Sequence, residues 1–250
     1  MRLDRFLSER TAFTRSQLKE WIAAGKVTVN GLAAAKPNMN VTETDAVLLN
    51  GQPVRSQKTL TVLLNKPAGY VSATEDRREQ TVLDLLPPEL QGQGLFPVGR
   101  LDKDTTGMLL LTNDGALSHR LTAPKKHVPK YYIATLARPF EPSYPQLFAA
   151  GMTLANGEVC QPAEVAPLGE DGRQALVCLH EGKYHQVRRM FAAVGNHVEQ
   201  LHRIGMGNLF LPPDLPSGKA FVLMDKDLYK VLNFETEFSA LLQMIRKYSS

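Results

Sequence analysis

The chain has 250 residues, 43% of them hydrophobic, which is enough for one large and one small domain with separate cores. Charged residues make up 22%, and no repeat or low-complexity tract is visible, which excludes solenoids and disordered proteins. The N-terminal residues carry charges where a secretory signal needs an unbroken apolar stretch, and no apolar run reaches membrane-spanning length. We expect a globular, cytoplasmic protein without membrane contact.

The usual sequence signals for metals and cofactors are missing. Cys160 and Cys178 are the only two cysteines, no Cys-Xaa-Xaa-Cys pair occurs, and no histidines are paired at metal-ligand spacing. Neither GxGxxG nor GxxxxGK[ST] occurs, which removes the common signals for dinucleotides and nucleoside triphosphates. We expect two reduced, buried cysteines, no metal site and chemistry that needs no cofactor.

The net charge of +4 is distributed unevenly. Residues 1–58 hold nine Lys or Arg against five Asp or Glu, whereas residues 59–250 hold twenty of each. Because a local excess of positive charge attracts phosphates and raises association rates, the first quarter of the chain is the candidate for binding a polyanion.

Two short amphipathic helices and a small sheet are predicted for residues 1–58. Apolar residues recur at i, i+3 and i+4 in two places, Leu3, Phe6 and Leu7, then Leu18, Trp21 and Ile22. Thr14 and Gln17 predict a capping box at the start of the second helix, and Gly25 is expected to end it. Asn30-Gly31 and Asn50-Gly51 follow short apolar runs and predict hairpin turns. Residues 52–59 are expected to form a polar linker.

Basic residues line the polar side of this region. Arg15 and Lys19 lie four positions apart on the face opposite the apolar one, and Lys26 follows the helix. A charged helix face alone is usually just solvated. However, the stretch RLDRFLSERTAFTRSQLKEWIAAGKVTVNG resembles the RNA-binding domain first defined in ribosomal small-subunit protein four. The resemblance and the charge excess together favour an RNA-binding surface with Arg2, Arg5, Arg15, Lys19 and Lys26.

From Leu60 onward, short apolar runs separated by turns predict an α+β domain with a mainly antiparallel sheet. Helices are expected near residues 114–122, 143–150 and 184–194. This second domain is predicted to span residues 59–233. Residues 234–250 carry apolar residues at helical spacing and are expected to form a C-terminal extension that packs as a helix.

Three stretches of the second domain carry candidate chemistry. In LFPVGRLDKDTTGMLLLTNDG, Asp102 lies on a turn between two apolar segments, where a rigid framework can direct it into a cleft. An Asp in a turn is nevertheless more often a backbone cap or solvated, and Asp104 keeps that interpretation. In the stretch EGKYHQVRRMF, an inward-pointing arginine would need an anionic partner. In HVPKYYIATL, strand alternation places Tyr131 and Tyr132 on opposite faces of the sheet.

These stretches, together with LNKPAGYVSAT, resemble the ordered motifs of pseudouridine synthases, in the branch that acts on ribosomal RNA and carries an N-terminal domain of the kind described above. Within that branch, HRLTAPKKHVPKYYIATLARP and HQVRRMFAAVGNHVEQLHR are most similar to members acting on small-subunit (16S) ribosomal RNA. The resemblance covers roughly residues 1–232. It implies Asp102 as the catalytic aspartate, Tyr132 as the aromatic residue that packs on the target base, and Arg188 as the ionic partner of Asp102.

The implied reaction fits these residue types. It detaches uracil from its ribose and rejoins it through carbon 5, so neither metal, reductant nor phosphate donor is needed. A neighbouring arginine typically lowers a carboxylate pKa by about 1 to 3 units and would keep Asp102 ionised. The target nucleotide must leave its stack, and an aromatic ring such as Tyr132 can replace the lost stacking.

Other basic residues of the second domain have two interpretations each. Arg100 either contacts phosphate or supports the Asp102 turn, and Lys125 and Lys126 either grip the RNA backbone or form a solvated loop. Residues from Lys66 to Gly69 match a family motif but are expected to be structural, and His185 is expected to orient rather than to act as a base. The RNA contacts expected in this domain are Arg100, Lys125, Lys126, Lys130 and Arg189.

Three alternatives remain open from the sequence. The chain could be a noncatalytic RNA-binding assembly factor, a pseudouridine synthase for large-subunit ribosomal RNA, or a glycosidase that uses Asp102 and Asp104 as its carboxylate pair. The expected partner is small-subunit ribosomal RNA, either naked or in a pre-ribosomal assembly intermediate, and the protein is expected to be a monomer.

Overall fold

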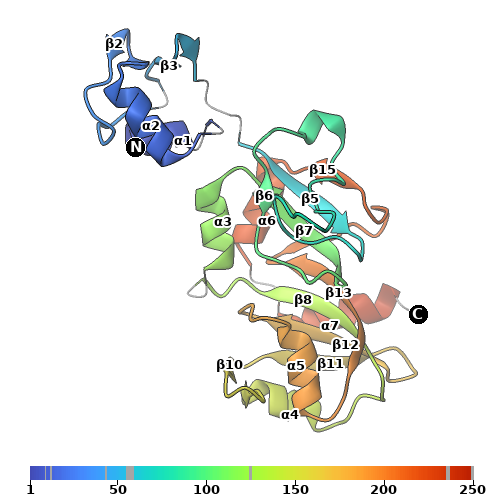
Figure 1. The fold of residues 1–250 in the computed structure, drawn as a ribbon. Coiled ribbons are helices and arrows are strands. Elements are labelled where there is room, and N and C mark those ends of the chain that lie inside the picture. Colours follow the sequence, from blue (N-terminus) through green and yellow to red (C-terminus); the bar gives the residue numbers. More distant parts are fainter. Residues whose placement is uncertain are drawn as a thin grey trace. The chain divides into compact units, whose positions relative to one another are not determined.

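The computed structural model describes residues 1–8, 10–11, 13–42, 44–54, 59–123, 126–234 and 237–248, without the side chains of residues 247 and 248. The chain divides into two compact units, Met1–Lys58 and Thr59–Ser250, which are described separately (Figure 1). Within the described part of the chain, no helix is long and apolar enough to cross a bilayer.

The first unit consists of two helices and a small antiparallel sheet with strand order β2-β1-β3-β4. The capping box predicted at Thr14 and Gln17 is present, and Asn30 and Asn50 have the left-handed backbone (φ 51° and 50°) that their hairpin turns require. The elements are α1 Leu3–Ser8, α2 Arg15–Ala23, β1 Val27–Val29, β2 Leu32–Ala33, β3 Val47–Leu49 and β4 Gln52–Pro53.

Strand β4 corrects the linker expected at residues 52–59. The Asn50-Gly51 turn folds Gln52–Pro53 back onto β3, where Pro53 lies opposite Leu48 at the edge of the sheet. Proline is tolerated there because an edge strand does not need every N–H. Residues 55–58 lie outside the described residues.

The second unit is built on a sheet that has nine strands within the described residues, with the main order β11-β12-β8-β13-β7-β5-β15. Strand β14 pairs with β13, β6 pairs with β7, and a separate hairpin joins β9 and β10. The bounds are β5 Thr61–Lys66, β6 Phe96–Pro97, β7 Thr106–Thr112, β8 Lys130–Leu136, β9 Met152–Thr153, β10 Val159–Cys160, β11 Glu164–Leu168, β12 Gln174–Leu179, β13 Val198–Met206, β14 Leu209–Phe210 and β15 Ala220–Val222.

The pairing in this sheet is mainly antiparallel, as predicted, but β13 and β7 run parallel. Gly107 makes their close approach possible. A Cβ at this position would collide with the backbone carbonyl of Arg203, and its φ of +96° also disfavours a side chain. The start of β7, which directly follows the Asp102 turn, is therefore fixed against the centre of the sheet.

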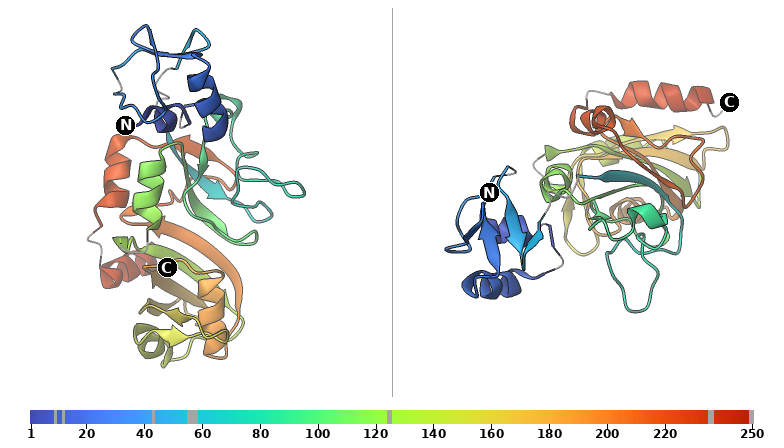
Figure 2. Two further views of the ribbon diagram at one scale, coloured as in Figure 1. Left: turned by 60° about the vertical axis from the view of Figure 1, so that its left-hand side comes forward. Right: turned by 90° about the horizontal axis from the view of Figure 1, so that it is seen from above.

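The sheet buries both faces. One face packs against α4 (Tyr144–Ala149) and α5 (Gln186–Ala193), and its core includes Tyr132. The other face packs against α7 (Phe238–Tyr248), and its core includes Tyr131 and Leu241 (Figure 2). The two tyrosine rings thus lie on opposite faces, as strand alternation predicted.

A third core lies around β5 and β7 and includes apolar residues of α3 (Gly115–Thr122) and α6 (Asp225–Leu232). Helices α3, α4 and α5 confirm the three predicted near residues 114–122, 143–150 and 184–194. Helix α6 was not predicted, and neither was the short 3-10 helix at Pro88–Leu90.

Candidate active site

Asp102 lies on the connection between β6 and β7, and its side chain is 25% exposed. Gly99 has the left-handed φ of +72° that turns the chain after β6. The Ser72 hydroxyl accepts a hydrogen bond from the backbone N–H of Leu101 at 3.1 Å and donates to its carbonyl at 2.9 Å. These buried contacts fix the residue that precedes the carboxylate.

The ammonium group of Lys66 holds the same turn through hydrogen bonds to its backbone. Lys66 is fully buried, and its Nζ donates to the backbone carbonyls of Pro67 (3.0 Å), Asp102 (3.1 Å), Lys103 (3.1 Å) and Thr105 (2.8 Å). Burial lowers the pKa of Lys66 to about 8, while the charges of Asp104 and Asp102 oppose this shift. The Lys66 motif is therefore structural, as expected, and its structural role is to hold the backbone of the candidate catalytic turn.

Asp102 and Tyr132 line one cleft, whose volume is about 70 Å³. The carboxylate comes from the turn before β7, and the ring comes from the core face of β8. Ligand pockets usually measure about 300–1,000 Å³, so this cleft is smaller than a typical ligand site. The remaining lining residues are Arg100, Leu101, Thr105, Leu179, Gly182, Lys183, His185, Gln186, Val187 and Leu201.

His185 faces the carboxylate directly, with its Nε2 3.4 Å from Asp102 Oδ1. It precedes α5 in a left-handed conformation (φ 49°), and its ring stacks on Tyr184 with 3.9 Å between ring centroids. Tyr184 is 75% exposed. No sequence pattern predicts the contact between His185 and Asp102, because it depends on this left-handed backbone conformation.

Arg188 has a different partner from the one predicted. Its Nη2 lies 2.7 Å from Asp104 Oδ2, and its Nη1 donates to the carbonyl of Val198 at 2.7 Å. The carbonyl of Val198 fixes the guanidinium beside β13, where the next acidic residue of the turn, Asp104, meets it. The predicted pairing of Arg188 with Asp102 is therefore wrong for this structure, although the inward arginine does have an anionic partner.

The predicted RNA contacts of the second unit fall into two groups. Arg100 and Lys126 are exposed, and Arg100 also lines the cleft. Lys130 is only partly exposed, its Nζ donates to the carbonyl of Val128 at 2.9 Å, and burial lowers its pKa to about 8. Arg189 binds Glu158 at 2.8 Å and the carbonyl of Tyr184 at 3.0 Å. Lys130 and Arg189 thus serve contacts within the unit, and Lys125 lies outside the described residues.

In the first unit, all five basic residues predicted to bind RNA are exposed. Arg2 forms an ion pair with Asp4 at 2.7 Å. The ammonium of Lys26 lies 5.7 Å from the ring centroid of Trp21. Arg5, Arg15 and Lys19 are the other exposed members of this set.

Comparison with known proteins identifies the family. The family model described as RNA pseudouridylate synthase matches residues 60–193, which include the Asp102 turn, Tyr132 and Arg188. The chain belongs to this family. An S4 domain model matches residues 1–47 of this RNA pseudouridylate synthase. The enzyme is accordingly an isomerase with an N-terminal S4 domain.

Relatives of similar length support the assignment. An uncharacterized RNA pseudouridine synthase, YtzG, of Bacillus subtilis strain 168 is 41% identical over 92% of this chain and 97% of its own length. The ribosomal small subunit pseudouridine synthase A of Pasteurella multocida strain Pm70 is 42% identical over 88% of this chain and 94% of its own. A crystal structure of a pseudouridylate synthase, 35% identical, superposes with a TM-score of 0.67 over 92% of this chain and 99% of that one.

Proposed function

We propose that this pseudouridine synthase isomerises a uridine of small-subunit (16S) ribosomal RNA, with Asp102 as the catalytic carboxylate. The observation that carries the proposal is the shared cleft of Asp102 and Tyr132, in which an anchored carboxylate faces a site lined by an aromatic ring. The small-subunit target is supported by the name of the Pasteurella multocida relative, which is 42% identical.

The reaction breaks the bond between N1 of uracil and C1′ of the ribose and forms a bond from C5 to C1′. The proton on C5 is lost and N1 gains one, so substrate and product are isomers. Asp102 acts in ionised form, either as the nucleophile at the sugar or as the base. The Lys66 anchor holds the backbone of Asp102, which keeps the carboxylate aimed at the sugar without solvent reorganisation.

The base reaches Asp102 after it has left its stack. Tyr132 offers a ring against which the extruded pyrimidine packs, and this replaces part of the lost stacking energy. His185 now contacts Asp102, and its stacking partner Tyr184 is exposed. Movement of the His185 ring away from the carboxylate widens the cleft for the nucleotide.

The first unit supplies affinity for the RNA backbone. Its exposed Arg15, Lys19 and Lys26 attract phosphate groups, and this attraction does not depend on the RNA sequence. We place the enzyme in the cytoplasm as a monomer, with naked ribosomal RNA or a pre-ribosomal assembly intermediate as its substrate.

The test is a map of pseudouridines in ribosomal RNA from cells with and without the chain, complemented with wild type, Asp102→Asn or Asp104→Asn. We expect one pseudouridine of small-subunit RNA to disappear and to return with wild type and Asp104→Asn. Asp102→Asn should bind the RNA normally and lower turnover by at least ~1,000-fold, because the carboxylate acts on the reacting atoms.

Each alternative has its own outcome. Equal turnover by Asp102→Asn would end the assignment of Asp102. Loss of a large-subunit pseudouridine would move the substrate to the other subunit, and an unchanged map would favour a noncatalytic assembly factor. Free uracil as the main product would favour a glycosidase, although Asp104, the second carboxylate of that alternative, is bound by Arg188.

A further inference from the structure

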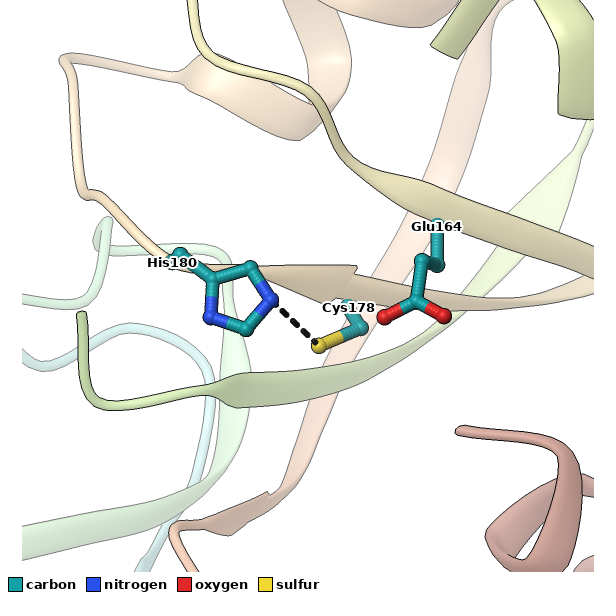
Figure 3. Close-up of side chains that lie close together, drawn as sticks. All are labelled: Glu164, Cys178 and His180. Carbon is teal, nitrogen blue, oxygen red and sulfur yellow. Dashed lines mark hydrogen bonds between the residues drawn. The ribbon is translucent and has the colours of Figure 1, made fainter. Parts of the chain in front are cut away.

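Three potential metal ligands meet on the face of the sheet opposite the Asp102 cleft. Cys178 on β12 lies directly across from Glu164 on β11, and His180 follows Cys178 by two positions on the same side. Their donor atoms all lie within 4.8 Å of one another, and Cys178 Sγ is 3.9 Å from His180 Nε2. In Figure 3 the sulfur of Cys178 lies between the imidazole of His180 and the carboxylate of Glu164.

The histidine is oriented as a ligand. His180 Nδ1 lies 3.0 Å from the backbone carbonyl of His127. A carbonyl only accepts hydrogen bonds, so Nδ1 carries the proton and Nε2 presents its lone pair toward the sulfur. Histidines that bind metals usually donate their second N–H to a carbonyl or carboxylate in this way.

The cysteine is unsuited to redox chemistry. Cys178 is only 1% exposed, and its sulfur lies within the core of the sheet. A buried thiol of this kind is a poor nucleophile and resists oxidation. A divalent cation placed among the three donors would instead replace the thiol proton, which passes to water, and neutralise the thiolate and the carboxylate together.

We propose that Glu164, Cys178 and His180 form a binding site for a divalent transition-metal ion, with Zn²⁺ as the best match. Sulfur, imidazole nitrogen and carboxylate oxygen are the ligand types of zinc, and a tetrahedral ion holds its donors about 3.5 Å apart. The largest contraction required is therefore about 1.3 Å, within reach of side-chain rotation because Glu164 is exposed and His180 partly exposed. Water completes the fourth position on the open side.

The position of the site indicates a structural role. Cys178 belongs to the same core cluster as Leu241 of α7, and His180 contacts the loop after α3 through the carbonyl of His127. A bound ion would join β11, β12 and this loop. The sequence did not reveal the site, because its ligands come from two strands whose register is set by the sheet.

Cobalt binding tests the proposal directly. The full-length chain without a purification tag is titrated with Co²⁺ alone, and the thiolate-to-cobalt charge-transfer absorption reports coordination by sulfur. We expect one Co²⁺ per chain in wild type and in Cys160→Ser, whose cysteine is equally buried but lies outside the cluster. Cys178→Ser should lose the charge-transfer band, and His180→Gln and Glu164→Gln should raise the Kd by at least ~10-fold.

Thermal unfolding with Zn²⁺ gives a second readout, because a ligand that binds only the folded state raises the Tm. We expect Zn²⁺ to raise the Tm of wild type and Cys160→Ser but not of Cys178→Ser or Cys178→Ala. If the cysteine variants do not fold, His180→Gln decides, since this partly exposed side chain can be replaced without opening the core. Absence of the band in wild type, or unchanged cobalt affinity in His180→Gln, would overturn the proposal.

Discussion

The positively charged side chains of the two units differ in their exposure and in the partners that they bind. In the first unit, Arg15, Lys19 and Lys26 are exposed at the surface, where their charges add up to one positive electrostatic field. In the second unit, Lys66 is fully buried and bound to four backbone carbonyls, and Arg188 is held between Asp104 and Val198. Under the proposed function, the exposed charges would attract the RNA backbone, whereas the buried Lys66 would hold the turn that carries Asp102. The net charge of a unit indicates the exposed, field-forming charges, but not a single buried cation such as Lys66.

Among the cations of the two units, the buried Lys66 is expected to have the largest effect on kcat when it is removed. Lys66→Met leaves four backbone carbonyls without their donor, so the Asp102 turn loses its fixed position. Because a displacement of about 1 Å in an active site can cost ~100-fold in rate, we expect kcat to fall by ~100-fold with little change in RNA affinity. Single-turnover kinetics and filter binding measure the two quantities.

The matched control is Lys226→Met on α6, which replaces an exposed lysine of the same unit. Its kcat should equal that of wild type. If Lys66→Met also turned over at the wild-type rate, the buried anchor would have no part in catalysis.

Arg188→Gln should lower kcat by ~10-fold, because hydrogen bonds to a charged group are worth about 1.5–3 kcal/mol. Arg188 also lies on α5, the helix that begins after His185, so its loss would affect the residue that contacts Asp102. Asp104→Asn should change kcat by less than about threefold, since Asp104 is 65% exposed and such pairs contribute about 0–1 kcal/mol. Equal losses in both variants would mean that their ion pair itself supports catalysis. A loss confined to Arg188→Gln would favour a second role for the guanidinium once RNA is bound.

The pH dependence of kcat distinguishes a loss of the Lys66 hydrogen bonds from a loss of folding stability. Lys66, whose pKa burial lowers to about 8, loses its proton as the pH rises through that value and then has fewer N–H donors for the turn. We expect kcat to fall by about threefold above pH 8 in wild type, but not in Lys66→Met. The unfolded lysine keeps its proton up to about pH 10.5, so the unfolded chain binds more protons between these values and the contribution of Lys66 to stability rises with pH.

Kinetics and chemical unfolding measured at the same pH values distinguish these trends. Parallel loss of activity and of the free energy of unfolding would assign the alkaline decline to other groups.

No effect on the chemical step is expected from the exposed cations. Neutralising Arg15, Lys19 and Lys26 together to Gln should flatten the log-log salt dependence of RNA affinity by about 2, at about 0.7 per phosphate contact with single-stranded RNA. The kcat of this triple variant at saturating RNA should stay at the wild-type value. An unchanged slope would show that these side chains face away from the RNA.

The sequence predicted features that follow from local patterns. Helical spacing predicted α1, α2 and α7, alternation separated Tyr131 from Tyr132, and a turn between apolar segments predicted that Asp102 lies at a cleft. Contacts that depend on the path of a loop or on strand register were missed. The backbone conformation of His185 brings it to Asp102, the carbonyl of Val198 places Arg188 beside Asp104, and the β11–β12 register brings Glu164 to Cys178.

The anchor under the Asp102 turn makes no use of side-chain identity. Every acceptor of the Lys66 ammonium is a main-chain oxygen, including those of Lys103 and Thr105. Exposed residues flanking the aspartate can therefore be exchanged without removing an acceptor of the ammonium, provided that the exchanged residues follow the same backbone path. A library confined to exposed positions of this turn would vary the surroundings of Asp102 while its backbone stays held by Lys66.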